Sequence, residues 1–210
     1  MGLIHLTLKE FIAVTASDAP APGGGSVSAL AGALSAALAE MVANLTVGKE
    51  KYAASQDTMA TLLPQVRALT DAFVLAVDAD SRAFDGYMAA LAMPKATDEE
   101  KAARSKAMQN GLKEAARVPL RVAELAVSLF PHLQAVLTLG NKNAVTDAMV
   151  GTMLARTCAL GAIYNVRVNL SSIKDEVFVA ELSSACERLQ ADAIALEQAL
   201  LQKVPEISKL

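Results

Sequence analysis

Residues 26–45, SVSALAGALSAALAEMVANL, are almost entirely small or apolar, and this run constrains the fold more than any other feature. Its length is enough to cross a bilayer. However, seven of its twenty residues are alanine, its one charged residue, Glu40, would be costly in lipid, and no aromatic belt flanks it. We therefore expect a central helix surrounded by protein and buried in a subunit interface, with a membrane span as the alternative.

The rest of the chain shows helical periodicity and no useful β-alternation. We expect an all-α fold, a single-domain bundle of six to eight helices over residues 1–210 around the long central apolar helix. Pro64 and Pro119 should kink or split their helices, and Ser26 should cap the central one. The expected helices cover about 8–15, 26–46, 53–91, 97–130, 143–163 and 174–203. Capping boxes that start at Thr7 and Thr97 should begin two of them, and Ser172 followed by Asp175 gives another cap-like start. We expect a loop at Pro131 and a less regular segment over residues 165–175.

Composition excludes several classes of function. A net charge of −3 gives no general attraction to nucleic acid or to an anionic membrane. Cys158 and Cys186 lie outside any CxxC pair, so we expect buried thiols in a reducing cytoplasm. The amino-terminal stretch MGLIHLTLKE lacks the features of a signal peptide. No metal motif, HExxH or GxSxG occurs, and His5 and His132 lack motif neighbours. The expected site contains no metal.

The segment PAPGGGS, residues 20–26, places three glycines directly before the central helix. It fits neither a Walker loop nor a Rossmann fingerprint. At a helix amino end, unpaired N–H groups and the positive end of the dipole face outward, and glycines allow a ligand to approach the backbone. Gly23, Gly24, Gly25 and Ser26 are therefore candidates for substrate binding. The alternative is a flexible connector.

The segment TVGKEKY, residues 46–52, follows the same helix. Gly48 is a natural residue to end it, and Lys49 and Lys51 favour the negative helix end. This placement alone explains both lysines. The functional alternative is an anion clamp.

Two further segments carry aspartates that could act in catalysis. In VDADSRAF, Asp78 and Asp80 point to different sides of a helix, and Asp80 shares a face with Phe84. An exposed aspartate is usually only solvated. In GNKNAVTDAMVGTML, Asp147 lies on an otherwise apolar stripe, which is costly unless the group is paired or functional.

Three asparagines are polar candidates beside these aspartates. Asn141 suits the cap of the helix that carries Asp147. Asn165 and Asn169, one turn apart, suit either backbone carbonyls or a ligand.

Six motifs in order resemble the cyclodeaminase/cyclohydrolase family, which includes the cyclodeaminase domain of formiminotransferase-cyclodeaminase and stand-alone methenyltetrahydrofolate cyclohydrolases. The resemblance covers about residues 5 to 180, and the ordered set is specific although each motif alone is weak. One departure is Glu50, where the family has a GKKKY-like segment, so only the flanking lysines carry over. The motifs are PAPGGGS, MVANLTVGKEKY, DADSRAF, MPK, LGNKNAVTDA and NVRVNL.

The resemblance implies an all-helical cytoplasmic enzyme, a homodimer or an assembly of dimers. Its substrate is a tetrahydrofolate derivative, which can be polyglutamylated, and no other cofactor is required. The leading activity is formiminotetrahydrofolate cyclodeaminase, and the alternative is methenyltetrahydrofolate cyclohydrolase. The preceding formiminotransferase domain is expected to be a separate protein with a functional link to this one.

The resemblance also suggests roles. Asp147 and Asp80 are the candidate acid and base, in either order, and Lys49 stabilises charge or binds the glutamate tail. Ser26, Lys49, Asp80 and Asp147 should then converge on one pterin cavity. The substrate-binding candidates are Gly23, Gly24, Gly25, Ser26, Lys51, Tyr52, Phe84, Asn141, Asn165 and Asn169.

Two alternatives of other classes remain. One is a folate-binding helical scaffold without catalysis, for which Glu50 is the only support in the sequence. The other is the membrane-embedded helical protein considered above.

Overall fold

The computed structural model describes residues 2–203, which form an elongated bundle of α-helices without a β-strand. This confirms the expected all-α class. Residue 1 and residues 204–210 of the expected domain lie outside the described residues. The helices are α1 (Leu8–Thr15), α2 (Gly24–Asn44), α3 (Gln56–Leu91), α4 (Asp98–Ser128), α5 (Phe130–Leu139), α6 (Val145–Leu170) and α7 (Glu176–Leu201), with short 3₁₀ turns η1 (Leu3–His5), η2 (Glu50–Ser55) and η3 (Lys142–Ala144).

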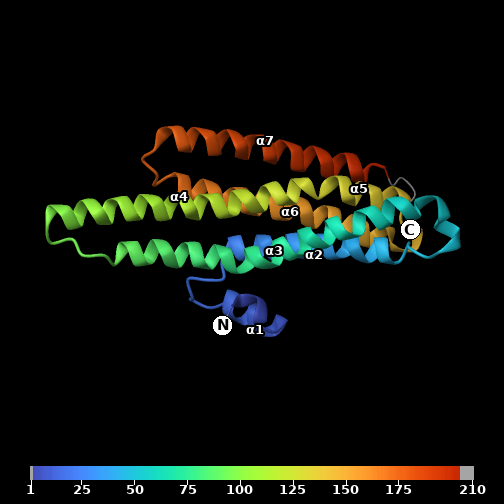
Figure 1. Cartoon of the computed structure of the whole chain (residues 1–210), viewed down its shortest axis with the longest axis horizontal. Helices are drawn as coiled ribbons and strands as arrows, with labels where there is room; N and C mark the ends of the chain where they lie inside the picture. Colours follow the sequence, from blue (N-terminus) through green and yellow to red (C-terminus); the bar gives the residue numbers. More distant parts are fainter. Residues whose placement is uncertain (1, 204–210) are drawn as a thin grey trace.

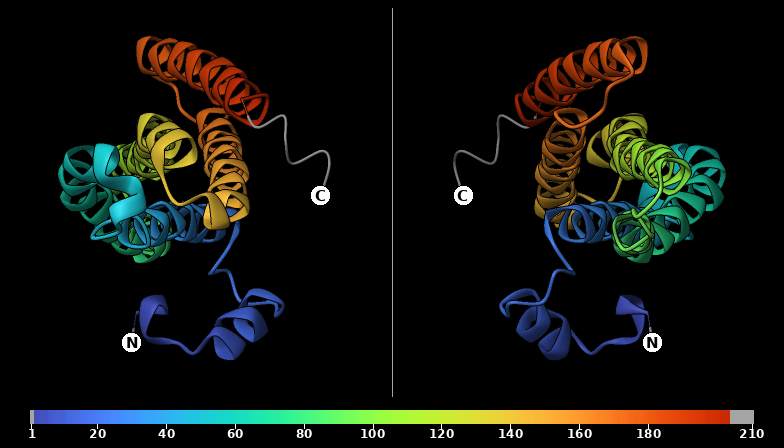
Figure 2. Two further views of the ribbon diagram at one scale, coloured as in Figure 1. Left: turned by 90° about the vertical axis from the view of Figure 1, so that its right-hand side faces the viewer. Right: turned by 90° about the vertical axis from the view of Figure 1, so that its left-hand side faces the viewer.

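Four long helices, α2, α3, α4 and α6, make the body of the bundle (Figure 1). The central helix α2 packs mainly on α3 and α6, and α4 packs on α3 and α6. The α7 helix covers α6 and α4, and α1 stands off the bundle on its other side (Figure 2). The hairpin of α3 and α4 runs past the amino end of α2, so one end of the bundle lacks α2 as a neighbour.

Small residues allow α2 to pack closely against its neighbours. Ala29, Ala36 and Ala39 are fully buried. At Gly32, an added Cβ would lie 2.8 Å from the Sγ of Cys158 and would overlap the Phe73 ring. The alanine-rich run is therefore a packing surface on the side that faces α3 and α6.

Both cysteines are free and buried, as the sequence predicts. Burial raises the pKa of Cys158 to about 12. The Cys158 thiol is therefore neutral at physiological pH.

The opposite face of α2 is open. Val27, Leu34 and Met41, spaced by seven residues, are 40%, 50% and 37% exposed. By length and composition, α2 and stretches within 50–91 and 98–139 would suffice to span a membrane, and 56% of the apolar window of α2 is buried inside the bundle. On the side that faces α3 and α6, α2 is surrounded by its own chain. The expected burial of its other side in a subunit interface stays a prediction.

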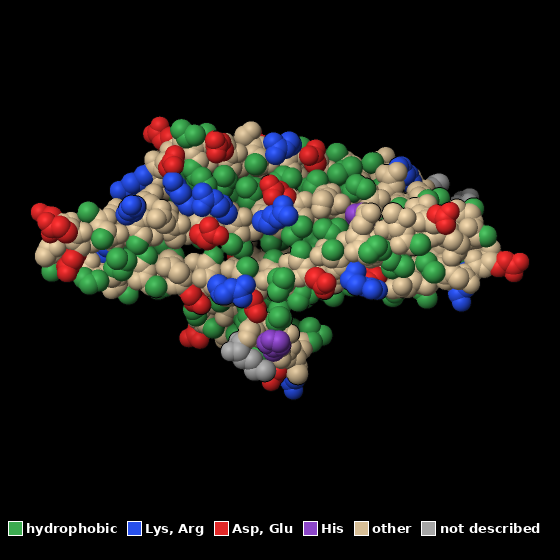
Figure 3. Space-filling model, in the orientation of Figure 1, with side chains coloured by type: hydrophobic (Ala, Val, Ile, Leu, Met, Phe, Trp, Pro, Cys, Tyr) green, Lys and Arg blue, Asp and Glu red, His purple; other side chains and the backbone are tan. Residues whose placement is uncertain are grey.

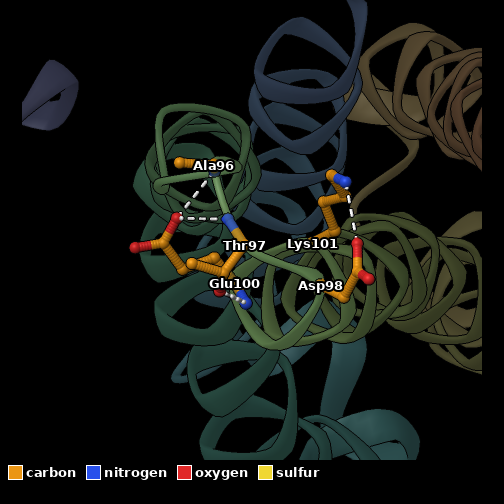
Figure 4. A network of polar contacts seen from close by, with 5 residues as sticks. All are labelled: Ala96, Thr97, Asp98, Glu100 and Lys101. Carbon is orange, nitrogen blue, oxygen red and sulfur yellow. Dashed lines mark hydrogen bonds and ion pairs between the residues drawn. The ribbon is translucent and has the colours of Figure 1, made fainter.

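The capping predictions have mixed outcomes. Capping boxes begin α1 at Thr7 and α4 at Thr97, as expected; at the second, Glu100 accepts N–H bonds from Ala96 and Thr97 (Figure 4). Ser26 does not cap α2, because that helix begins at Gly24 with Gly23 as the N-cap.

Two other helix boundaries differ from the prediction. Asp175 caps α7, but the expected partner Ser172 does not. Pro131, expected in a loop, lies in the first turn of α5, a position where a missing N–H is harmless.

The remaining differences concern helix continuity. Pro64 and Pro119 lie inside α3 and α4, and neither splits its helix. The Ala115 carbonyl, which Pro119 cannot bond, accepts the Asn169 amide at 3.0 Å. The segment 165–170, expected to be irregular, completes α6. A side chain from a neighbouring helix thus replaces the bond that the proline removes.

Candidate active site

The first group of candidate residues lies at the amino end of α2, where α3 passes closely. An added Cβ on Gly25 would overlap the carboxyl group of Asp80. The Ser26 N–H donates to that carboxylate, and the Ser26 hydroxyl, fully buried, donates to the Val77 carbonyl at 2.8 Å. The amino end of α2 therefore lies against a carboxyl group of the same protein.

Asp80 is half-buried, and its ionisation is perturbed. Burial raises the pKa of Asp80, and the bond from the Ser26 N–H opposes this shift without cancelling it. A carboxyl group with a raised pKa keeps its proton to higher pH, which suits a general acid.

The neighbours of Asp80 on α3 differ in role. Asp78 accepts the Leu3 N–H at 2.6 Å and so holds the amino-terminal segment. The hydroxyl of Ser81 is buried and has no hydrogen-bond partner among the described residues. Phe84, one turn beyond Asp80, is 37% exposed. Sequence reasoning overlooked Ser81, and its place beside Asp80 in the DADSRAF motif was the available signal.

The two asparagines of α6 reach the same region. A Cβ on Gly24 would lie 3.2 Å from the Nδ2 of Asn165, so the Asn165 amide borders the glycine corner. Its Nδ2 donates to the Gly161 carbonyl at 2.8 Å. Asn169 donates to carbonyls of α4 and α6. Asn169 therefore holds helices together, whereas Asn165 directly faces the candidate site.

The second group of candidates lies at the other end of α2. The Tyr52 hydroxyl donates to Asn141 Oδ1 at 3.1 Å and accepts the Lys142 N–H at 3.0 Å. The Asn141 N–H donates to Thr46 Oγ1 at 2.9 Å, and the Asn141 amide donates to the Leu45 carbonyl. This network fixes the loop before α6 against the carboxyl end of α2.

Charged groups surround this network. Lys49 and Lys51 are exposed, and the Lys51 ammonium lies 5.5 Å from the centre of the Tyr52 ring. Gly48 takes a positive φ of 74°, which turns the chain after the helix. Asp147 lies half-buried in the first turn of α6 and has no hydrogen bond or ion pair within residues 2–203. Its carboxylate is available to a ligand.

The two groups do not meet within one chain. The α2 helix has 21 residues, and at a rise of about 1.5 Å each it separates its ends by about 30 Å. Asp80 and Ser26 therefore lie far from Lys49 and Asp147. The predicted single cavity requires a second contribution, such as another copy of the chain.

Comparison with known proteins relates this arrangement to a family. A family model described as formiminotransferase-cyclodeaminase matches residues 7–188. The formimidoyltransferase-cyclodeaminase of Sus scrofa is 38% identical over 192 residues, covering 91% of this chain and 36% of the relative. The methenyltetrahydrofolate cyclohydrolase of Methylorubrum extorquens is 37% identical, covering 94% of this chain and 95% of the relative.

A solved structure is also similar. The crystal structure of formiminotetrahydrofolate cyclodeaminase from Thermotoga maritima matches with a TM-score of 0.86 at 31% identity, covering 97% of this chain and 98% of that one. The chain spans about a third of the length of the animal relatives it matches.

Proposed function

The chain belongs to the formiminotransferase-cyclodeaminase family, and we propose that it is an enzyme converting 5-formiminotetrahydrofolate to 5,10-methenyltetrahydrofolate and ammonia. One observation of the structure carries this proposal. Asp80 is a half-buried acid whose pKa is raised. It lies against the amino end of α2, beside the three glycines at the start of this helix. A carboxyl group in this state keeps its proton to higher pH than an ordinary aspartate, which suits a group that donates a proton to a leaving amine.

The proposed reaction begins when N10 attacks the formimino carbon on N5, forming a tetrahedral carbon. Asp80 donates its proton to the amino group on that carbon, the bond to this nitrogen breaks, and ammonia leaves. Asp147 accepts the proton that N10 loses, and the 5,10-methenyl ring closes. The raised pKa of Asp80 and the unpaired carboxylate of Asp147 support this assignment of acid and base. Lys49 supplies a positive charge beside the reacting groups.

The remaining candidate residues would bind and orient the folate substrate. The backbone at Gly23 and Gly24 and the amide of Asn165 would contact the pterin or p-aminobenzoyl part. Tyr52 and Asn141 would hold the loop that positions Asp147. Orientation of N10 toward the carbon supplies much of the rate in such ring closures. The proposed mechanism uses proton transfers and requires no cofactor besides the folate substrate.

We further propose that the active site forms between two copies of the chain. A two-fold dimer in which α2 packs antiparallel on its counterpart would place the Asp80 end of one helix beside the Asp147 end of the other. The exposed stripe Val27, Leu34 and Met41 supports this packing, because it is apolar and follows the heptad spacing of helix pairs. The proposed dimer covers the open face of α2 with a second copy of the chain rather than with lipid. The proposed enzyme is cytoplasmic and has no nucleic-acid partner.

The dimer proposal has its own test. Leu34→Glu places a charge at the middle of the stripe and should give monomers in sedimentation analysis, with loss of turnover. The matched control is Val177→Glu, on α7, where the side chain is 69% exposed outside the stripe. If Leu34→Glu monomers kept full activity, the shared site would be refuted.

A second activity, methenyltetrahydrofolate cyclohydrolase, is favoured by the Methylorubrum extorquens relative, which matches this chain along nearly its whole length. Water would attack the same methenyl carbon, and the ring would open to 10-formyltetrahydrofolate. The same acid and base would serve that reaction.

Paired assays distinguish the two activities. With 5-formiminotetrahydrofolate, cyclodeaminase activity raises the near-ultraviolet absorbance of the methenyl product and releases ammonia. With methenyltetrahydrofolate, cyclohydrolase activity alone accelerates the loss of that absorbance. Asp147→Asn, run beside the unchanged protein, should lower either activity by about a hundredfold or more. Tight folate binding without turnover would instead indicate a non-catalytic scaffold.

A further inference from the structure

A groove of about 490 Å³ runs along the surface between α3 and α4. None of the candidate site residues lines this groove, and Asp80 faces α2 instead. Figure 3 shows Lys and Arg side chains over α3 and over α4 in this part of the molecule, with apolar side chains between them. The groove is therefore a feature of the surface separate from the proposed active site.

The floor of the groove is apolar because two helix faces with short side chains meet there. Ala72, Ala76 and Ala79 follow one another on α3 at spacings of four and three residues, so they lie on one face of that helix. Val118 and Val122, one turn apart on α4, line the same groove. Alanine side chains are too short to fill the space between the two helices. A ridge of side chains from a further helix can enter the hollow that remains.

Longer apolar side chains extend this floor to the edges of the groove. Leu75 lies on the α3 edge and Leu125 on the α4 edge. The Leu75 side chain is 63% exposed, although it borders an apolar surface that could bury it. From Ala72 to Arg82 the α3 helix rises about 15 Å, so the groove is as long as about three turns of a helix packed along it.

Three arginines border the apolar floor. Arg82 lies on α3, and Arg117 and Arg121 lie one turn apart on α4. Glu114 is the one acid among the lining residues, so the groove carries an excess of positive charge in a chain whose net charge is −3. Arg82 forms no ion pair within residues 2–203. The charge is therefore local, and it favours an anionic ligand.

Contacts on α4 restrict two of these arginines without neutralising them fully. The Arg117 guanidinium lies 5.0 Å from the centre of the Phe178 ring, and its ion pair with Glu114 measures 3.6 Å. Arg121 pairs with Glu124 at 3.4 Å. Both pairs are exposed and each contributes little stability, so the guanidinium groups can also bind a second carboxylate. An arginine that is already restricted loses less freedom when it binds.

We propose that this groove binds an acidic amphipathic helix of a partner protein. The apolar face of that helix would cover the alanine floor, and its carboxylates would pair with the arginines on the two edges. Two acids one turn apart on the partner match the spacing of Arg117 and Arg121. Docking of an amphipathic helix into an apolar groove is a recurring mode of recognition, and arginine is enriched at such interfaces.

The same features argue against other anionic partners. Within the groove no aromatic residue offers a surface on which nucleic-acid bases could stack. A lipid surface is broad and cannot fill a concave groove between two helices. A helix with an apolar face and acidic flanks satisfies both the shape and the charge.

The first test uses a designed probe in place of the partner. It is a helical peptide of about 16 residues, with leucines on one face and glutamates on both sides of that face. The unchanged protein should bind this peptide in fluorescence anisotropy without any folate, and Arg82→Glu/Arg121→Glu should weaken the binding by about tenfold or more. The control Lys106→Glu/Arg188→Glu reverses two exposed cations outside the groove and should leave the affinity unchanged.

The charge reversal should also change which peptide is preferred. A matched peptide with lysines in place of the glutamates should bind Arg82→Glu/Arg121→Glu more tightly than it binds the unchanged protein. Equal losses of acidic-peptide binding in the groove variant and in the control, in proteins with native circular dichroism, overturn the proposal, because net charge alone would explain them. Failure of the unchanged protein to bind the acidic peptide also overturns it.

A second test concerns the apolar floor. Leu75→Asp should lower the affinity for the acidic peptide by about tenfold or more, since it removes apolar contact and adds a repelling charge. The matched control is Val177→Asp, on α7, where the side chain is similarly exposed outside the groove.

Two results would assign the groove to another occupant and so overturn the proposal. One is a smaller assembly of Leu75→Asp in sedimentation without peptide, which would indicate a contact between copies of this chain. The other is flotation with anionic vesicles that is lost in Arg82→Glu/Arg121→Glu, which would indicate a membrane. All of these measurements report binding, so their outcome does not depend on whether the chain turns over a folate.

Discussion

Gly25 is the residue at which the structure makes the sharpest prediction. An alanine Cβ at this position would overlap the carboxyl carbon and both oxygens of Asp80. Either the first turn of α2 moves away from α3, or Asp80 rotates out and loses the Ser26 N–H. Overpacking of this kind costs about 1–3 kcal/mol, and losing a hydrogen bond to a charged acceptor costs about 1.5–3 kcal/mol.

Replacing a helical glycine returns about 1 kcal/mol. By the two routes, the net destabilisation from Gly25→Ala is about 0–2 kcal/mol. This lowers the Tm of a chain of this size by at most about 8 °C. The effect on activity should be larger, because both routes displace the proposed acid. We expect kcat/KM to fall by about a hundredfold or more.

Gly23→Ala is the internal control. An added Cβ at Gly23 meets nothing within 4 Å, and the residue has an extended backbone with a φ of −115°. Gly23→Ala should therefore keep the Tm of the unchanged protein in differential scanning calorimetry, whereas the methenyl absorbance assay is applied to Gly25→Ala. An equal loss of Tm in the two variants, or no loss of activity in Gly25→Ala, would refute the argument that close approach to Asp80 requires glycine at position 25.

Three further predictions concern other positions. Because the folded-state pKa of Asp80 is raised, the unchanged protein should lose stability as pH rises from the ordinary aspartate pKa through the raised one. In urea titrations across pH, Asp80→Asn should lack this loss. The same pH dependence of stability in both proteins would contradict the assignment. Tyr52→Phe should remove the bonds to Asn141 and Lys142 and cost about 1–3 kcal/mol in urea unfolding, with kcat falling through a misplaced loop; an unchanged kcat would separate this network from catalysis. Gly32→Ala should be strongly destabilising in the same assay, whereas Gly86→Ala, where an added Cβ meets nothing, should be neutral or stabilising.

The sequence predicted the helices and the family, because these depend on local periodicity, capping boxes and ordered motifs. The sequence predicted less well where a side chain of one helix forms a hydrogen bond with a backbone carbonyl of another helix. The sequence did not predict that α4 would continue through Pro119, because the amide that satisfies the freed carbonyl belongs to Asn169, fifty residues further along the chain. The sequence placed Ser26 at the helix cap because its actual partner, the buried Val77 carbonyl, is equally distant in sequence. Local patterns do not contain these long-range contacts.

The candidate site shows the same division between local and long-range information. The motifs named Asp80 and Asp147, but their separation by the length of α2 is a property of the assembled bundle.

This separation also gives the apolar α2 helix a function beyond packing. A rigid helix with small residues on its inner face fixes one candidate group at each end, and the exposed stripe on its outer face supplies a surface for a second copy. Antiparallel pairing of two such helices would create two equivalent sites at once, each with an acid from one chain and a base from the other. On this reasoning, mixing Asp80→Asn chains with Asp147→Asn chains should restore activity to about a quarter of the sites, since half of the dimers would be mixed and each of those would retain one intact site. Two inactive variants that never complement one another, although they exchange subunits, would place the whole reaction within a single chain.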